Sequence, residues 1–273
     1  MIDQKTKVIA IASGKGGVGK SMISANISFL LADKGYKVGI FDGDIGLSNL
    51  DIIFNVKSKN NFLNVLKGEC TLEDIKITID NNLTLIPSES GDEILQYEPK
   101  VIQEALLKKS SFLDKLDYLI IDTSSGIGNF TKIFLQCADE IIIVTTSNPL
   151  AITDAYTLIK ITSTINKNLN LIVNMTENEK EGKVIYENIR KVAKNNIETP
   201  FSLNYLGHIE TSKNISKSIK FRQLFTKTTP SSLSSFHLSE IVDNLILQLE
   251  NQAPPKKTKN SFKLFIKRVI DNF

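Results

Sequence analysis

The sequence has little of what disulfide frameworks, metal clusters and membrane spans require. Among its 273 residues are only two cysteines, Cys70 and Cys137, and no tryptophan. The cysteines are far apart and neither belongs to a C-x-x-C pair, which argues against a disulfide framework, a cysteine zinc site or an iron–sulfur cluster. No apolar run is long enough to span a bilayer, and no signal-peptide pattern opens the chain. We therefore expect a cytoplasmic protein.

Histidine is also scarce. The two histidines, His208 and His237, stand without the cysteine or acidic pattern that is typical of metal ligation. We expect each of them to be a surface or partly buried residue with no metal role.

Basic charge is concentrated at the end of the chain. The net charge is +3, but residues 251–273 hold six lysines and arginines and one aspartate, or +5, which leaves the preceding body at −2. A slightly acidic body lacks the basic surface that sequence-independent DNA binding needs, so no nucleic-acid partner is expected.

One glycine-rich stretch, Gly14–Ser21, has the spacing G-x-x-x-x-G-K-[ST]. It follows the apolar run Val8–Ala12 and precedes a helical pattern that repeats from Ile23 to Leu31, so a strand, a loop and a helix are predicted in succession. Backbone N–H groups of such a loop bind phosphates, helped by the positive end of the helix dipole. The alternative is a glycine-rich turn without a ligand. The predicted phosphate-binding residues are Gly14, Gly16, Gly17, Val18, Gly19, Lys20 and Ser21.

Two residues of this loop have distinct expected roles. Lys20 would neutralise the β- and γ-phosphates of a nucleotide, and the Ser21 hydroxyl would bind Mg²⁺.

Aspartates follow two further predicted strands. Asp42 and Asp44 end the run Val38–Phe41, and Asp122 ends the continuous apolar run 116–121, which is typical of a parallel strand buried on both faces. Carboxylates at the carboxyl ends of such strands lie where open α/β sheets bind ligands, and Asp122 is predicted to hold Mg²⁺ through a bound water. The alternative for Asp42 and Asp44 is a loop with helix-capping carboxylates.

The extra lysine in Lys15–Ser21 makes the loop resemble the deviant Walker A motif of the MinD/ParA ATPases, and the resemblance extends from residue 7 to about residue 249. It implies an ATPase with ATP and Mg²⁺ as cofactors that forms an ATP-dependent homodimer. It also implies that Lys15 reaches the partner's nucleotide, Asp42 binds Mg²⁺, Asp44 orients the attacking water and Asn174 hydrogen-bonds adenine. Lys15, Lys20 and Asp44 are thus the expected catalytic residues.

Within this family, three segments are most similar to the flagellar-number regulators, the FlhG branch also called YlxH or FleN: 42–51, 153–160 and Asn174-Met175. The resemblance implies ATP-dependent control of flagellar number and placement, with the GTPase FlhF and flagellar basal-body components as partners. The alternatives are a septum-positioning MinD and, less favoured, a DNA-partitioning ParA. An iron–sulfur scaffold would need cluster cysteines, and a binding module that does not hydrolyse ATP is the remaining possibility.

Alternating strand and helix patterns through at least six strands predict a doubly wound, mostly parallel α/β sheet with helices on both faces, over residues 1–250. The last strand is predicted at 199–206, followed by a loop at 207–209 that closes over the base. A helix at 156–165 is expected to start at a cap formed by Asp154, and a final body helix is expected at 233–249.

The end of the chain reads as two further segments. Residues 251–260 are basic and proline-rich, which predicts an extended tether. Residues 261–273 place Phe262, Phe265, Ile266, Val269, Ile270 and Phe273 on one helical face. This amphipathic helix is predicted to bind the anionic inner surface of the cell membrane, reversibly and more tightly when two tails act together. The alternative is that it docks on its own domain.

Overall fold

The computed structural model describes residues 6–44, 49–88 and 112–251. In these ranges eight strands form one sheet in the order β3-β4-β2-β5-β1-β6-β7-β8. All neighbouring pairs are parallel except β3 and β4. The strands are β1 (Lys7–Ser13), β2 (Val38–Gly43), β3 (Ile77–Asp80), β4 (Leu83–Ile86), β5 (Tyr118–Ser125), β6 (Glu140–Thr146), β7 (Asn168–Thr176) and β8 (Ser202–Glu210). The predicted doubly wound fold is confirmed.

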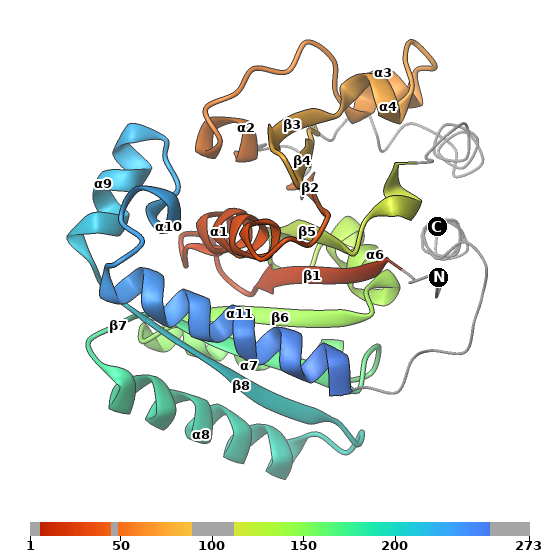
Figure 1. Cartoon of the computed structure of the whole chain (residues 1–273). Helices are drawn as coiled ribbons and strands as arrows, with labels where there is room; N and C mark the ends of the chain where they lie inside the picture. The colour runs from red at the N-terminus through yellow and green to blue at the C-terminus, as the bar shows by residue number, and fades with distance from the viewer. Residues whose placement is uncertain (1–5, 45–48, 89–111, 252–273) are drawn as a thin grey trace.

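Helices cover both faces of this sheet, with α1 and α11 on the near side in Figure 1 and α6 and α7 behind. The longer helices are α1 (Lys20–Asp33), α6 (Asn129–Cys137), α7 (Pro149–Thr162), α8 (Glu179–Asn196), α9 (Lys213–Phe221) and α11 (Leu233–Asn251). The short ones are α2 (Leu50–Ile53), α3 (Phe62–Leu66), α4 (Leu72–Ile75), α10 (Phe225–Thr228) and the 3₁₀ turn η2 (Leu113–Lys115).

The core has two layers because the central strands bury both faces. Along β1, Ile9 and Ile11 belong to the cluster that includes α1 and α11, whereas Val8 and Ala10 belong to the cluster that includes α6, α7 and α8. Both pairs are almost completely buried. Alternate apolar side chains of one short strand therefore hold helices against opposite sides of the sheet.

The structure differs from the sequence-based expectations at three places. Strand β3 was not predicted, since Ile77–Asp80 is short and half-exposed, and it pairs antiparallel with β4. Helix α7 begins at Pro149, because the Asn148 side chain accepts a hydrogen bond from the Leu150 N–H at 2.9 Å. Asp154 therefore lies inside α7 and does not cap it.

The third concerns the predicted loop at 207–209, which is strand. β8 continues to Glu210 because a register shift between its pairs with Leu171 and Ile172 absorbs one extra residue. Gly207 follows that shift with φ +150°, and a Cβ there would lie 2.7 Å from Ile241 Cγ1 of α11. Glycine at this position thus lets α11 approach the strand.

The predicted final helix is confirmed, since α11 spans Leu233–Asn251. Within the described ranges, none of the helices combines the length and hydropathy that crossing a bilayer requires. The amphipathic segment 261–273 and the tether from residue 252 lie outside the described residues.

Candidate nucleotide-binding site

The glycine-rich loop connects the carboxyl end of β1 to the first turn of α1, as predicted. Gly19 directly precedes α1 with φ +88°, and a Cβ there would lie 2.4 Å from Asn174 Nδ2. Gly14 faces α7, where a Cβ would lie 2.4 Å from the backbone oxygen of Asp154. Both glycines therefore allow the loop to fit between β7 and α7, and a larger residue at either position would displace it.

Lys20 and Asp122 form a buried ion pair beneath the loop. Lys20 Nζ lies 2.8 Å from Asp122 Oδ1, and the two side chains are 6% and 1% exposed. Ser24 Oγ of α1 donates a second hydrogen bond of 2.8 Å to the same oxygen. The predicted phosphate-binding cation and the predicted metal carboxylate thus meet, although they come from α1 and β5.

Asp42 lies directly beside Asp122, because the two residues are register partners on the adjacent strands β2 and β5. It is 1% exposed. Its carboxylate accepts backbone N–H bonds from Asp44 at 3.2 Å, Asn49 at 3.2 Å and Leu50 at 3.1 Å. Asp42 therefore anchors both ends of the segment that follows β2.

Asp44 is half-buried in the same region. Burial raises the pKa of its carboxyl above the usual range, while the Lys20 charge and a hydrogen bond from Ser124 oppose this shift. The Asp44 carboxylate is therefore within electrostatic range of Lys20 and Asp122, between the ends of β2 and β5.

Lys15, Gly16, Gly17 and Ser21 are on the outer part of the loop. Lys15 is half-buried, and its backbone oxygen accepts a bond of 3.0 Å from Ser13 Oγ. The Ser21 side chain is half-buried at the start of α1, and its Oγ lies 3.5 Å from Lys20 Nζ. The structure thus places Ser21 beside the Lys20–Asp122 pair.

Asn174 contacts the loop itself. Its Nδ2 donates a hydrogen bond of 2.8 Å to the backbone oxygen of Val18, and its side chain is 6% exposed. Sequence reasoning assigned this residue to adenine and missed its bond to the loop. Ser24 and the backbone of Asp154 were also missed, because their roles depend on helix packing that no local motif encodes.

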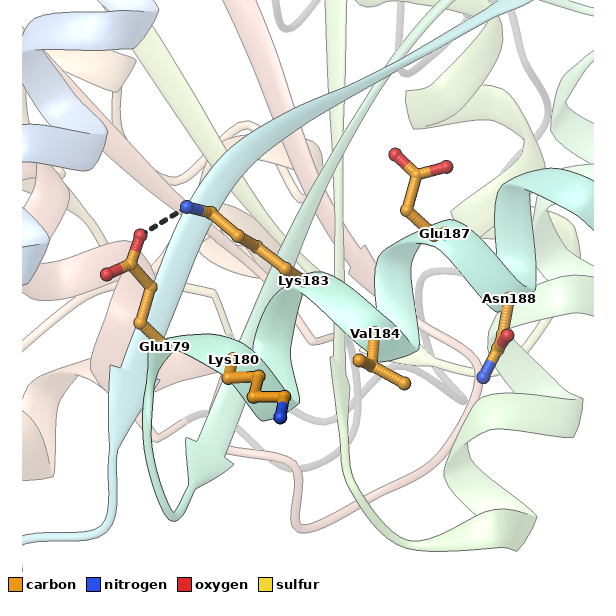
Figure 2. A pocket seen from close by; sticks show the side chains of 6 residues that line it. All are labelled: Glu179, Lys180, Lys183, Val184, Glu187 and Asn188. Atoms are coloured by element: carbon orange, nitrogen blue, oxygen red, sulfur yellow. Dashed lines mark ion pairs between the residues drawn. The ribbon is translucent and has the colours of Figure 1, made fainter.

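The hollow drawn in Figure 2 does not coincide with the predicted nucleotide site. All of its lining residues lie on α8 and are exposed, and Glu179 and Lys183 pair with each other across it. None of the predicted site residues contributes to it, and its charges pair within one helix face, so it offers no convergent set of ligand-binding groups.

Comparison with known proteins agrees with this geometry. Residues 4–246 match the family model described as "ParA: NUBPL iron-transfer P-loop NTPase". The chain is 47% identical to the flagellum site-determining protein YlxH of Helicobacter pylori over 97% of its own length and 90% of that protein's. It is 27% identical to the antiactivator FleN of Pseudomonas aeruginosa over 97% and 94% of the two chains.

A solved structure supports the fold. The septum site-determining protein MinD of Pyrococcus horikoshii OT3, solved as a complex with Mg-ADP, superposes with a TM-score of 0.71 at 23% identity. The match covers 91% of this chain and 100% of that one. Together with the loop between β1 and α1 and the carboxylates of β2 and β5, these matches show that the chain belongs to the ParA family of P-loop NTPases.

Proposed function

We propose that this protein is a Mg²⁺-dependent ATPase that dimerises on ATP, associates with the cell membrane and regulates the number and placement of flagella. The observation that carries the proposal is the 47% identity to the flagellum site-determining protein YlxH, which extends over 97% of this chain. A similarity of that extent includes the loop, the aspartates and the whole sheet.

The residues at the carboxyl ends of β1, β2 and β5 fit a nucleotide with Mg²⁺. Backbone N–H groups of residues 14–19 and the Lys20 ammonium suit phosphates, while the Ser21 hydroxyl and the carboxylates of Asp42 and Asp122 suit a hard cation. When bound, Mg²⁺ would offset the negative charge of the phosphates.

The Lys20–Asp122 pair gives the site a charge-balanced resting state. Removing one partner of a buried ion pair typically costs about 3–5 kcal/mol. Lys20 would turn from Asp122 toward phosphate oxygens, and Asp122 would then help to hold Mg²⁺. Each side chain would then exchange its present partner for another of the same sign: Lys20 would face phosphate, and Asp122 would face the cation. The Lys20–Asp122 pair can therefore separate on nucleotide binding without leaving a buried charge unpaired.

Three further roles follow from the family. Lys15, on the outer part of the loop, would reach the nucleotide of a second copy. Asp44 would orient the attacking water from its position between β2 and β5. Asn174 would contact adenine from the end of β7, where its amide already holds the loop.

Residues 261–273 would bind anionic lipid through their apolar face and basic flank, with 251–260 as the tether. Two tails on one dimer would bind more tightly than one through effective concentration, so ATP would recruit the protein and hydrolysis would release it. FlhF and basal-body components are the proposed partners at the membrane.

Deleting the gene and counting flagella and septa tests the biological role. Altered flagellation with normal division is expected, whereas minicells would point to septum positioning instead. The enzymatic role is tested by measuring phosphate release, which Asp44→Ala should abolish. Wild-type turnover in that variant would overturn the assignment of Asp44.

Membrane recruitment needs a separate experiment. Liposomes of anionic lipid should sediment the protein with ATP more than with ADP, and deleting residues 261–273 should remove the binding. Equal sedimentation in all three cases would rule out the switch.

A further inference from the structure

The only two histidines in the sequence lie against each other in the fold. His208 is on β8 and His237 is on α11, and their ring centroids are 4.4 Å apart with 44° between the ring planes. Glu210 of β8 joins them, with Oε1 3.8 Å from His208 Nε2. One ligand atom from each of the three residues lies within 4.8 Å of the other two. Neither histidine has a metal-ligand pattern in the sequence around it, because the second histidine arrives from another element.

Two nitrogens of this group, one from each histidine, have no hydrogen-bond partner among the described residues. His208 is 7% exposed, and its buried Nε2 lacks a hydrogen bond. The same holds for His237 Nδ1 and for the hydroxyl of Tyr205. Buried polar atoms in folded proteins are nearly always bonded, so two unbonded imidazole nitrogens in one group with a carboxylate indicate a shared ligand.

Helix α8 closes the group from another side. A Cβ on Gly182 would lie 2.6 Å from Tyr205 Oη and 2.8 Å from His208 Cβ, so the helix backbone packs directly on both residues. Glu179, one turn earlier and visible in Figure 2 with Lys183, lies near enough for both imidazoles to affect it: its pKa is lowered first by Lys183 and to a smaller degree by His208 and His237. A carboxylate thus stands near the histidines without belonging to the group.

We propose that His208, His237 and Glu210 bind a divalent transition metal, with Zn²⁺ as the ion that this donor set fits best. Two imidazoles and one carboxylate are a common zinc ligand set, whereas Mg²⁺ and Ca²⁺ prefer oxygen donors throughout. Tetrahedral zinc with bonds of about 2.0–2.2 Å holds its donors roughly 3.3 Å apart. The three side chains would therefore close slightly from their present separations, and water would fill the fourth position.

Such a metal would have a structural role. Among the described residues, β8 is the last strand of the sheet and pairs only with β7. His237 lies in the second turn of α11, the helix that leads to the residues proposed to bind the membrane. The metal would tie the carboxyl end of this edge strand to the start of that helix. The proposal does not rest on the proposed function.

Co²⁺ is the probe that tests it, because tetrahedral Co²⁺ absorbs visible light strongly. The full-length chain without a histidine tag is stripped with a chelator and titrated in millimolar Mg²⁺, which keeps Co²⁺ from the nucleotide site. We expect one equivalent to bind with tetrahedral visible bands, Zn²⁺ to displace it, and Zn²⁺ to raise the melting temperature. His237→Gln should weaken binding by about a hundredfold or more and abolish both signals, since even outer-sphere changes cost 10- to 100-fold.

Glu240→Gln is the matched control, because this carboxylate is exposed on the same helix and lies outside the group. It should leave the titration unchanged. If His237→Gln does not fold by circular dichroism, Glu210→Gln replaces it, since that side chain is only partly buried. Failure of the wild type to bind Co²⁺, an octahedral spectrum, or unchanged tetrahedral bands in a folded variant would overturn the proposal.

Discussion

Lys20 of α1 and Asp122 of β5 form an ion pair of 2.8 Å in which both side chains are buried. We expect Asp122→Asn to lower the free energy of unfolding by about 3 kcal/mol without nucleotide, because the Lys20 ammonium then lacks its counter-charge in a buried place. The Ser24 hydroxyl can still donate to an amide oxygen, so the loss reports mainly on charge. Urea unfolding measures the change.

The control is the double variant Lys20→Met/Asp122→Leu. Replacing a buried pair with apolar residues of similar size is often close to neutral, so this variant should unfold within about 1 kcal/mol of the wild type while binding no nucleotide. Equal free energies of unfolding for the wild type and Asp122→Asn would show that the Lys20–Asp122 pair does not stabilise the fold.

Gly14→Ala should weaken both the fold and nucleotide binding. A Cβ at this position would lie 2.4 Å from the backbone oxygen of Asp154, so either the loop or α7 must move. Overpacking of this kind costs about 1–3 kcal/mol. Urea unfolding and fluorescent ADP titration provide the two readouts.

Gly128→Ala is the matched control for that change. Gly128 has φ −72°, and a Cβ at this position would meet no atom of the described residues within 4 Å, so alanine should be tolerated there. If Gly14→Ala behaved like Gly128→Ala, the close approach of α7 would not constrain the loop.

The Lys20–Asp122 pair and the Gly14–Asp154 contact also show how much of the candidate site can be predicted from the sequence. The loop and the aspartates Asp42 and Asp122 were predictable, because a local octapeptide and short apolar runs determine where each residue lies along its element, although β5 continues past Asp122 to Ser125. Parallel strands then bring their carboxyl ends to one edge of the sheet. The contact of Gly14 with Asp154 was not predictable, since it depends on how α7 packs.

The region around β8 was less predictable for a related reason. The strand passes a register shift at Gly207, which reads locally as a loop signal. His208 and His237 meet only because α11 returns over this strand, and no period or motif relates the two positions. Tertiary packing therefore supplies the parts of the molecule that local patterns omit.

Asn174→Ala distinguishes two roles of the Asn174 amide: binding adenine and supporting the loop. If Asn174 binds adenine, the variant should lose about 1 kcal/mol of its preference for ATP over GTP, or roughly fivefold. If the amide only supports the loop through its bond to Val18, both nucleotides should weaken equally. Competition titrations with the two nucleotides distinguish these outcomes, and the exposed Asn188→Ala on α8 serves as control.

Lys15→Ala tests whether the site is shared between two copies. Lys15 is half-buried in the loop, whereas Lys20 is buried beside Asp122, so the two lysines have different surroundings. The parent for this test is Asp44→Ala, which we expect to bind ATP without hydrolysing it. With Lys15→Ala added, the protein should remain monomeric with ATP by light scattering and should still bind Mg-ADP. Lys132→Ala, which removes an exposed charge from α6, should dimerise as its parent does. If the Lys15→Ala variant still dimerised, this lysine would not link the two copies. If the variant lost ADP binding, the Lys15 ammonium would act on the nucleotide of its own chain.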